Sequence, residues 1–184
     1  MVPKTSRSPR PAPPGARDDI AAMIRVDHAG EYGAVRIYQG QLAVLGRSQS
    51  AGAIRHMAKQ EAEHLKTFDA LVNQRRVRPT AFSPLWHVAG YALGAATALM
   101  GEKAAMACTV AVEEVIDAHY ARQVERLGDR DPALKTTIAA FRADEIAHRE
   151  AALELGAEQA PGYRLLSGAI KAGCRLAIAL STRI

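Results

Sequence analysis

The sequence predicts an all-α protein, and three observations lead to this fold class. Aromatic residues make up only 5% of the 184 residues, and the chain is rich in Ala and Leu with few runs of Val, Ile and Thr, which argues against a β-sandwich or β-barrel. Beyond residue 17 only four prolines interrupt the chain. Between them, apolar residues recur with the period of amphipathic helices. The length suits one domain with a single core.

The N-terminal segment differs from the rest in composition. Residues 1–17 hold four basic residues, no acidic residue and five of the nine prolines. Such a segment cannot bury enough apolar surface to order itself, so we predict a flexible Pro/Arg-rich tail at 1–17 and a folded domain at 18–184. The domain has 20 basic and 19 acidic residues, so most of the net charge of +5 belongs to the tail. We therefore expect no nucleic-acid partner.

Five helices are expected in the domain. The first opens with Asp18 or Asp19 as its N-cap, and the segment from Gly46 to Gly52 separates it from the second. The pair Asp131-Pro132 is typical of a helix start and opens the fourth. The predicted ranges are 18–46, 49–77, 86–128, 132–156 and 162–183.

Polar residues stand in the middle of four apolar helix faces. The first face contains Glu31. In the third helix, periodicity places Glu113, rather than Glu114, on the face with Met106, Val110 and Tyr120. The second and fourth faces each contain a Glu-x-x-His motif, formed by Glu61 with His64 and by Glu145 with His148.

These six residues predict a metal site. An inward carboxylate without a partner costs several kcal/mol, whereas a Glu and a His one turn apart can reach one metal ion. One Glu from each of two helices and a Glu-x-x-His from each of the other two form the ligand set of a carboxylate-bridged di-iron or di-manganese four-helix bundle. Four carboxylates also balance two divalent cations. Asp144, which precedes Glu145, is either a hydrogen-bond acceptor for a ligating His or a surface residue.

The spacing of the six residues indicates an internal duplication. Glu31 precedes Glu61 by 30 residues, and Glu113 precedes Glu145 by 32. Each half of the chain thus brings a Glu and then a Glu-x-x-His to the bundle axis, as a repeated helical hairpin would.

Two apolar segments are not needed for such a bundle. Residues 85–101 are almost uncharged and contain Trp86 and Tyr91 near one end, which favours a position at a membrane interface. Burial in a dimer or within the bundle explains this segment equally well. The apolar fifth helix, with cationic residues at its edges, makes membrane attachment the favoured joint explanation. Only Cys108 and Cys174 are present, which fits a reducing cytoplasm.

Longer motifs resemble a known family. The matching stretches are Arg25-Val-Asp-His-Ala-Gly-Glu-Tyr-Gly-Ala34, Arg76-Val-Arg-Pro-Thr80, Pro84-Leu-Trp86, Ala105-Met-Ala-Cys-Thr-Val-Ala-Val-Glu-Glu114 and Ala172-Gly-Cys-Arg-Leu-Ala177. On these stretches, which cover about residues 18–184 in order, the chain is similar to the demethoxyubiquinone hydroxylases of ubiquinone biosynthesis.

The resemblance implies a ferritin-like di-iron monooxygenase that hydroxylates the ring of a polyprenyl demethoxyquinone. It implies that the six residues above, Glu31, Glu61, His64, Glu113, Glu145 and His148, bind two iron ions, with Glu61 and Glu145 as bridges. It also implicates His119 and Tyr120 in electron or proton transfer. The implied co-substrates are O2 and an electron donor, NADH. The implied partners are the quinone, a membrane surface at the cytoplasmic face of the cell membrane, and a lipid-presenting protein of the same pathway; a homo-oligomer is also compatible.

Two alternatives accompany this interpretation. A ferritin-like iron oxidase or iron-binding protein would use similar ligands, but it has no use for two apolar interfacial helices. A metal-free membrane scaffold would leave six inward polar residues without a role. Metal analysis of the purified protein separates the second alternative from the first.

Overall fold

The computed structural model describes residues 16–184, with side chains from Asp18 onward, and no β-strand occurs within that range, so the predicted all-α class is confirmed. The predicted tail lies outside the described residues up to residue 15, whereas residues 16–17 belong to the first helix. The helices are α1 (Ala16–Leu45), α2 (Ala51–Arg75), α3 (Ser83–Leu99), α4 (Glu102–Leu127), α5 (Pro132–Glu154), the short 3-10 helix η1 (Ala157–Gln159) and α6 (Tyr163–Arg183).

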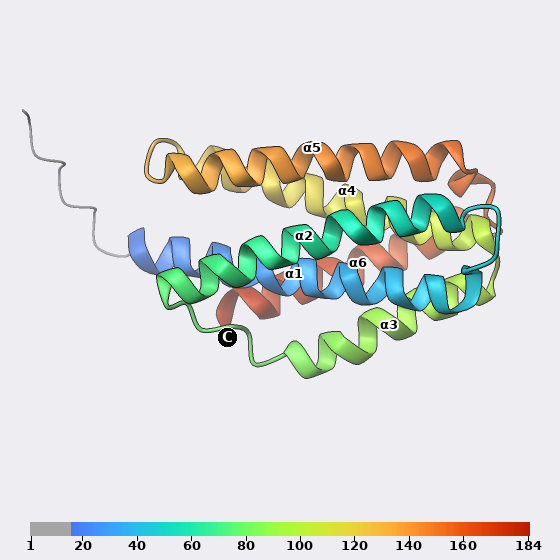
Figure 1. Cartoon of the computed structure of the whole chain (residues 1–184), viewed down its shortest axis with the longest axis horizontal. Helices are drawn as coiled ribbons and strands as arrows, with labels where there is room; N and C mark the ends of the chain where they lie inside the picture. The colour runs from blue at the N-terminus through green and yellow to red at the C-terminus, as the bar shows by residue number, and fades with distance from the viewer. Residues whose placement is uncertain (1–15) are drawn as a thin grey trace, which may run out of the picture.

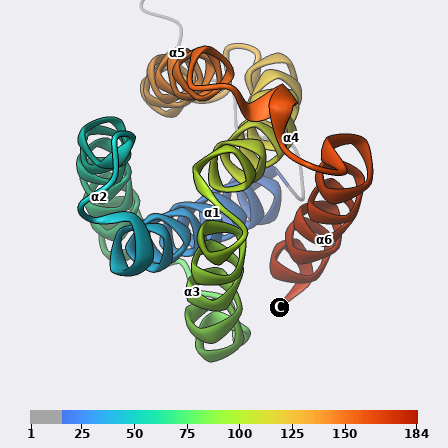
Figure 2. The same cartoon turned by 90° about the vertical axis from the view of Figure 1, so that its right-hand side faces the viewer.

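Four of these helices form the bundle. The hairpin of α1 and α2 lies beside the hairpin of α4 and α5, and all four run along the long axis of the molecule (Figure 1). Helix α3 packs on α1 and α6 packs on α4 (Figure 2). Each half of the chain therefore contributes a hairpin and a third helix that packs on the first helix of the same half, which extends the predicted duplication.

The prediction of one helix over 86–128 is wrong. The chain breaks at Met100-Gly101, where Gly101 adopts φ +112°, a conformation that L side chains rarely adopt. The break lets α3 lie against the outer side of α1 while α4 enters the bundle. The Glu102 carboxylate then accepts a hydrogen bond of 2.8 Å from the Ser50 backbone N–H, which ties this corner to the start of α2.

The two predicted helix starts with aspartate have different outcomes. The Asp131 side chain accepts a hydrogen bond of 3.0 Å from the Leu134 N–H, so Asp131 is the N-cap of α5 as predicted. Asp18 and Asp19 are not N-caps, because α1 already begins at Ala16 and both residues lie in its first turn. Negative charge is still favourable there beside the helix N-terminus, and Asp19 pairs with Arg130 of the loop after α4.

Two apolar clusters fill the bundle, one toward each end. Along α2, Met57 belongs to the first cluster and Phe68 to the second, and the Glu61-x-x-His64 motif lies between them. The order is reversed along α1, where Ile24 of the second cluster precedes Glu31 and Tyr38 of the first cluster follows it. The inward polar residues therefore lie in a layer across the middle of the bundle.

Helices α3 and α6 expose many apolar side chains. Leu99 of α3 is 76% exposed and Leu165 of α6 is 82% exposed, whereas core residues such as Ile54 are fully buried. Among the described residues, α6 is the helix whose length and apolar composition would suffice to cross a membrane, and only 17% of that apolar stretch is buried. This criterion is weak evidence when a single helix meets it.

Candidate metal centre

The structure brings the six predicted ligands together in the middle of the bundle. Glu31 comes from α1, Glu61 and His64 from α2, Glu113 from α4, and Glu145 and His148 from α5. All six are at most 3% exposed. Burial also confirms that Glu113 points inward, whereas Glu114 pairs with Lys171 of α6.

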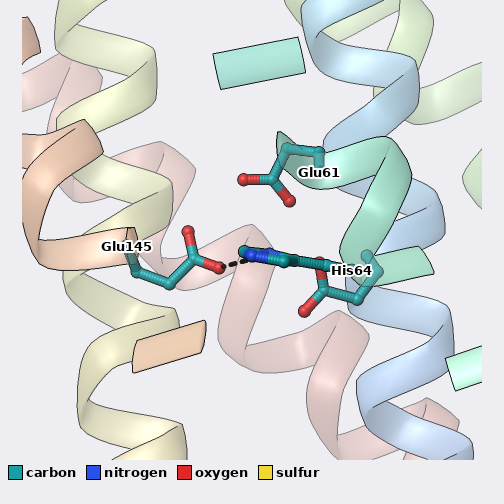
Figure 3. Close-up of side chains that lie close together, drawn as sticks. Glu61, His64 and Glu145 are labelled. Atoms are coloured by element: carbon teal, nitrogen blue, oxygen red, sulfur yellow. Dashed lines mark ion pairs between the residues drawn. The ribbon is translucent and has the colours of Figure 1, made fainter. Parts of the chain in front are cut away.

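The six side chains form two groups that can each hold a metal ion. Glu31 and His64 belong to the first group, and Glu113 and His148 belong to the second; Glu61 and Glu145 belong to both. Within each group the ligand atoms lie within 4.8 Å of one another. Figure 3 shows how Glu61 and His64 on α2 and Glu145 on α5 converge. The carboxylates shared by both groups are the two that the resemblance implies as bridges.

Glu145 lies between the two imidazoles. Its Oε1 is 3.4 Å from His64 Nδ1 and its Oε2 is 3.3 Å from His148 Nδ1. Glu61 Oε1 also lies 3.1 Å from His148 Nδ1, and Glu31 Oε2 is 3.5 Å from His64 Nδ1. Both Nδ1 atoms therefore face carboxylate oxygens contributed by two helices.

Several of these atoms have no hydrogen-bond partner in the described part of the chain, although they are fully buried. They are Glu31 Oε2, Glu61 Oε1, His64 Nδ1, Glu145 Oε2 and His148 Nδ1. A buried polar atom without a partner costs about 1–3 kcal/mol, and five in one layer require another explanation. Oxygen and imidazole donors without thiolates suit iron or manganese. The residues present therefore fit a pair of metal ions.

Two tyrosines bind the two unshared glutamates. The Tyr120 hydroxyl on α4 donates to Glu31 of α1, and the Tyr38 hydroxyl on α1 donates to Glu113 of α4, with 2.8 Å between the oxygens of the second pair. The helical periodicity placed Tyr38 on an apolar face and predicted no role for it in the site. A signal was available, because a tyrosine follows the glutamate by seven residues in both α1 and α4.

Two polar side chains contact the outer nitrogens of the histidines: Asp144 of α5, whose role the sequence left open, and Gln60 of α2, for which no role was predicted. Asp144 Oδ2 is 3.1 Å from His64 Nε2, so Asp144 is the hydrogen-bond acceptor and not merely a surface residue. Gln60 Oε1 is 3.1 Å from His148 Nε2. Each imidazole thus has a partner on its outer nitrogen, which fixes the orientation of its ring.

The predicted pair His119 and Tyr120 is divided between two environments. Tyr120 is buried and contacts Glu31, as described above. The Nε2 atom of His119 instead lies 3.1 Å from the buried Asp27 and 2.9 Å from the Gln123 side chain. His119 lines a separate cavity of about 260 Å³ between α1 and α4.

Burial and mutual repulsion perturb the acidic residues. Burial raises the pKa of Glu61 and Glu113 well above its usual value, and the charge of Glu145 adds to both effects. Burial likewise raises the pKa of Glu31. Burial alone would raise the pKa of Glu145 too, but the imidazoles of His148 and His64 outweigh it and hold that pKa at about 2. Cations in this layer would relieve the repulsion.

The metal-free protein should therefore lose stability as the pH rises from about 5 to 8. The raised pKa of Glu31, Glu61 and Glu113 means that the folded state retains protons that the unfolded chain releases above its ordinary pKa of 4.5. His64 acts in the same direction, because Glu145 and Glu31 overcome the opposing effect of burial and raise its pKa from 6.5 to about 10.

Calorimetry of the chelator-treated protein should show a melting temperature several degrees lower at pH 8 than at pH 5.5. The Glu113→Gln variant, which removes one of the titrating groups, should show a smaller decrease. A melting temperature that rises over this interval would contradict the prediction.

A large apolar cavity lies beside the metal centre. It has a volume of about 590 Å³, within the range of small-molecule sites, and α1, α3, α4 and α6 line it almost entirely with apolar side chains. Gly30 and Ile116 belong to its wall, one residue before Glu31 and three residues after Glu113. The first helices of the two halves therefore carry the metal-site glutamates on one face and line the cavity with another.

Comparison with known proteins agrees with this arrangement. The family described as Ubiquinone biosynthesis protein COQ7 matches residues 18–181. A 3-demethoxyubiquinol 3-hydroxylase of Rhodospirillum rubrum is 59% identical over 182 residues, which are 98% of this chain and 86% of the relative. The human NADPH-dependent 3-demethoxyubiquinone 3-hydroxylase, mitochondrial, is 51% identical over 92% of this chain and 80% of its own. The 5-demethoxyubiquinone hydroxylase, mitochondrial, of Saccharomyces cerevisiae is 40% identical over 88% of this chain and 77% of the relative.

The helical bundle with paired carboxylate and histidine residues at mid-height defines a protein of the ferritin-like class. Within that class, the chain belongs to the COQ7 family of ubiquinone biosynthesis proteins.

Proposed function

We propose that this protein is an oxygen-dependent hydroxylase that adds a hydroxyl group to the ring of a polyprenyl demethoxyubiquinone or demethoxyubiquinol. The observation that carries the proposal is the juxtaposition of two metal-binding groups with an apolar cavity of about 590 Å³. The names of the relatives supply the substrate class.

Glu31, Glu61, His64, Glu113, Glu145 and His148 would hold two iron ions, with Glu61 and Glu145 as the shared ligands. When bound, the irons would supply the electrons that activate dioxygen. The protein's own residues prepare the site for this chemistry. Tyr120 and Tyr38 donate hydrogen bonds that orient Glu31 and Glu113, and the surrounding apolar clusters exclude water.

The pair His119 and Tyr120 would carry protons or electrons between the surface and the centre. His119 lines the smaller cavity, and Tyr120, the next residue, donates to Glu31. The two adjacent residues thus connect two otherwise separate parts of the molecule. His119 is held by Asp27 and Gln123, which keeps its ring in place for this role.

The larger cavity would receive the quinone and part of its isoprenoid tail. Its apolar walls match a polyprenyl chain, and exposed apolar residues of α3 and α6, including Leu99 and Leu165, lie on the helices that form two of those walls. We propose that these helices attach the protein peripherally to the membrane, at its cytoplasmic face, from which the substrate is taken. The free cysteines Cys108 and Cys174 agree with a reducing compartment. Binding of a lipid-presenting partner protein and assembly into a homo-oligomer are further predictions that the structure of the single chain does not test.

Replacing Leu99 with aspartate tests this attachment. Leu99 is 76% exposed on α3, so the charge should weaken binding to liposomes several-fold without changing the iron content. Leu153→Asp is the matched control, because Leu153 is 37% exposed on α5, on the other side of the bundle. Equal co-sedimentation of the Leu99→Asp variant and the wild type would contradict the prediction. Leu93 is a poorer choice, because it lines the cavity and a charge there would also obstruct it.

The proposed reaction is tested directly with iron-loaded protein, a demethoxyquinone and O2. Because the human relative is named NADPH-dependent, the assay is run with NADH and with NADPH. We expect mass spectrometry to detect a quinone that has gained one oxygen atom. An iron oxidase would consume O2 with Fe²⁺ and leave the quinone unchanged, and that result would refute the proposal.

A further inference from the structure

A chain of hydrogen bonds on the outer side of the two histidines joins α2 to α5. His64 Nε2 lies 3.1 Å from Asp144 Oδ2, and the other oxygen of Asp144, Oδ1, accepts a hydrogen bond of 3.3 Å from Gln60 Nε2. Gln60 Oε1 in turn lies 3.1 Å from His148 Nε2. One carboxylate and one amide therefore connect the imidazoles of the two metal-binding groups.

The carboxylate determines the direction of every hydrogen bond in this chain. An ionised Asp144 is an acceptor at both oxygens, so His64 must donate from Nε2 and Gln60 must turn its NH2 group toward Asp144. This orientation leaves the Gln60 carbonyl oxygen for His148, which must also donate from Nε2. In the neutral form that binds a metal ion, both imidazoles then carry their lone pairs on Nδ1, the atoms that face the glutamates without a hydrogen-bond partner.

The two residues that link the histidines occupy equivalent sequence positions but differ in charge. Gln60 directly precedes Glu61, Asp144 directly precedes Glu145, and each contacts the histidine of the other helix. His64 thus has a charged acceptor on its outer nitrogen, whereas His148 has a neutral one. A charged acceptor makes the stronger hydrogen bond and raises the basicity of a ligating imidazole more.

We propose that Gln60 is a positioning residue that transmits the acceptor polarity of Asp144 to His148, and that the unequal partners make the two metal positions unequal, with the His64 position binding more tightly. This inference rests on the proposed two-iron site. It assigns Gln60 a role without direct contact with metal or substrate. It also predicts different affinities for the two ions, which the near-symmetric ligand set does not.

Anaerobic titration of the metal-free full chain with Fe²⁺, followed by calorimetry, tests the inference. The wild type should bind two ions in a tighter and a weaker step. Gln60→Leu should weaken the weaker step by about 10–100-fold and leave the tighter step unchanged. Asp144→Asn should weaken both steps, although Asp144 contacts only His64 of the two histidines. Lys59→Ala, an exposed neighbour on α2, is the control and should titrate as the wild type does.

The Gln60→Glu variant distinguishes hydrogen bonding from packing, because glutamate keeps an acceptor for His148. It should keep the weaker step, and because a charged acceptor then faces His148, the two steps should lie closer together than in the wild type. If Gln60→Leu binds both ions as the wild type does, or if Gln60→Glu loses the weaker step as completely as Gln60→Leu, the inference is wrong. A wild-type chain that binds no iron would instead overturn the proposed function, and this inference with it.

Discussion

Replacing Glu145 with alanine is expected to remove most of both metal ions and to lower hydroxylase activity by more than about 100-fold. Glu145 is shared by the two groups of ligands, and its two oxygens lie 3.4 and 3.3 Å from the Nδ1 atoms of His64 and His148. Loss of an outer hydrogen-bond partner of a ligand already costs about 10–100-fold, and a ligand common to both ions should cost more.

The shared and unshared glutamates should differ in this experiment. Glu61→Ala is expected to behave as Glu145→Ala does, because Glu61 also belongs to both groups. Glu31→Ala and Glu113→Ala each alter one group and should leave about one iron per chain. This difference follows from the geometry, because only Glu61 and Glu145 belong to both groups of ligands. It would not be expected if each glutamate contributed equally to both metal ions.

Iron content per chain by elemental analysis, with activity measured on the same preparations, decides this prediction. Glu150→Ala is the matched control, because Glu150 is exposed on the same helix as Glu145. Circular dichroism verifies that each variant is helical. Full iron content in Glu145→Ala would overturn the ligand assignment.

The Gly94→Ala substitution should have the largest effect on stability. A Cβ atom at Gly94 would lie 1.9 Å from the backbone oxygen of Ile37, and one at Gly40 would lie 2.2 Å from the backbone oxygen of Tyr91. The obstructing atoms belong to the backbones of α1 and α3, so no rotamer change can relieve the overlap, and the two helices must separate. We expect a loss of about 3 kcal/mol, or a melting temperature lower by about 6–12 °C.

Thermal unfolding of Gly94→Ala beside Gly52→Ala tests this prediction. Gly52 is also helical, but its added Cβ would meet nothing within 4 Å, so Gly52→Ala should leave the melting temperature unchanged or slightly higher. The predicted ligands all lie outside α3, so Gly94→Ala should retain iron at temperatures where it is folded. A melting temperature equal to that of the wild type would contradict the close approach of the two helices.

Much of the candidate site could be predicted because helical periodicity is a local property. A residue at a given place in the 3.6-residue repeat faces the core whichever helix lies opposite. That rule selected Glu113 over Glu114 and placed both Glu-x-x-His motifs on inward faces, and burial confirms these orientations. The role of Asp144 stayed open for the same reason, because the periodicity of one helix does not indicate which residue on another helix it contacts.

The break between α3 and α4 shows where local reasoning failed for the fold. No proline interrupts residues 85–131, and the apolar pattern continues through Met100 and Gly101. Gly101 is compatible with either a helix or a sharp turn. The turn is selected by long-range contacts, namely the packing of α3 on α1 and the hydrogen bond between Glu102 and Ser50.

The sequence by itself determined the helical class, the four inward carboxylates and the two inward histidines, because spacing within a helix decides which face a side chain occupies. The tertiary structure alone decided that Tyr38 and Tyr120 bind the glutamate of the opposite half, and that α3 and α6 enclose an apolar cavity. These features depend on the distances between helices, and those distances are set by how the side chains and backbones of different helices pack against one another.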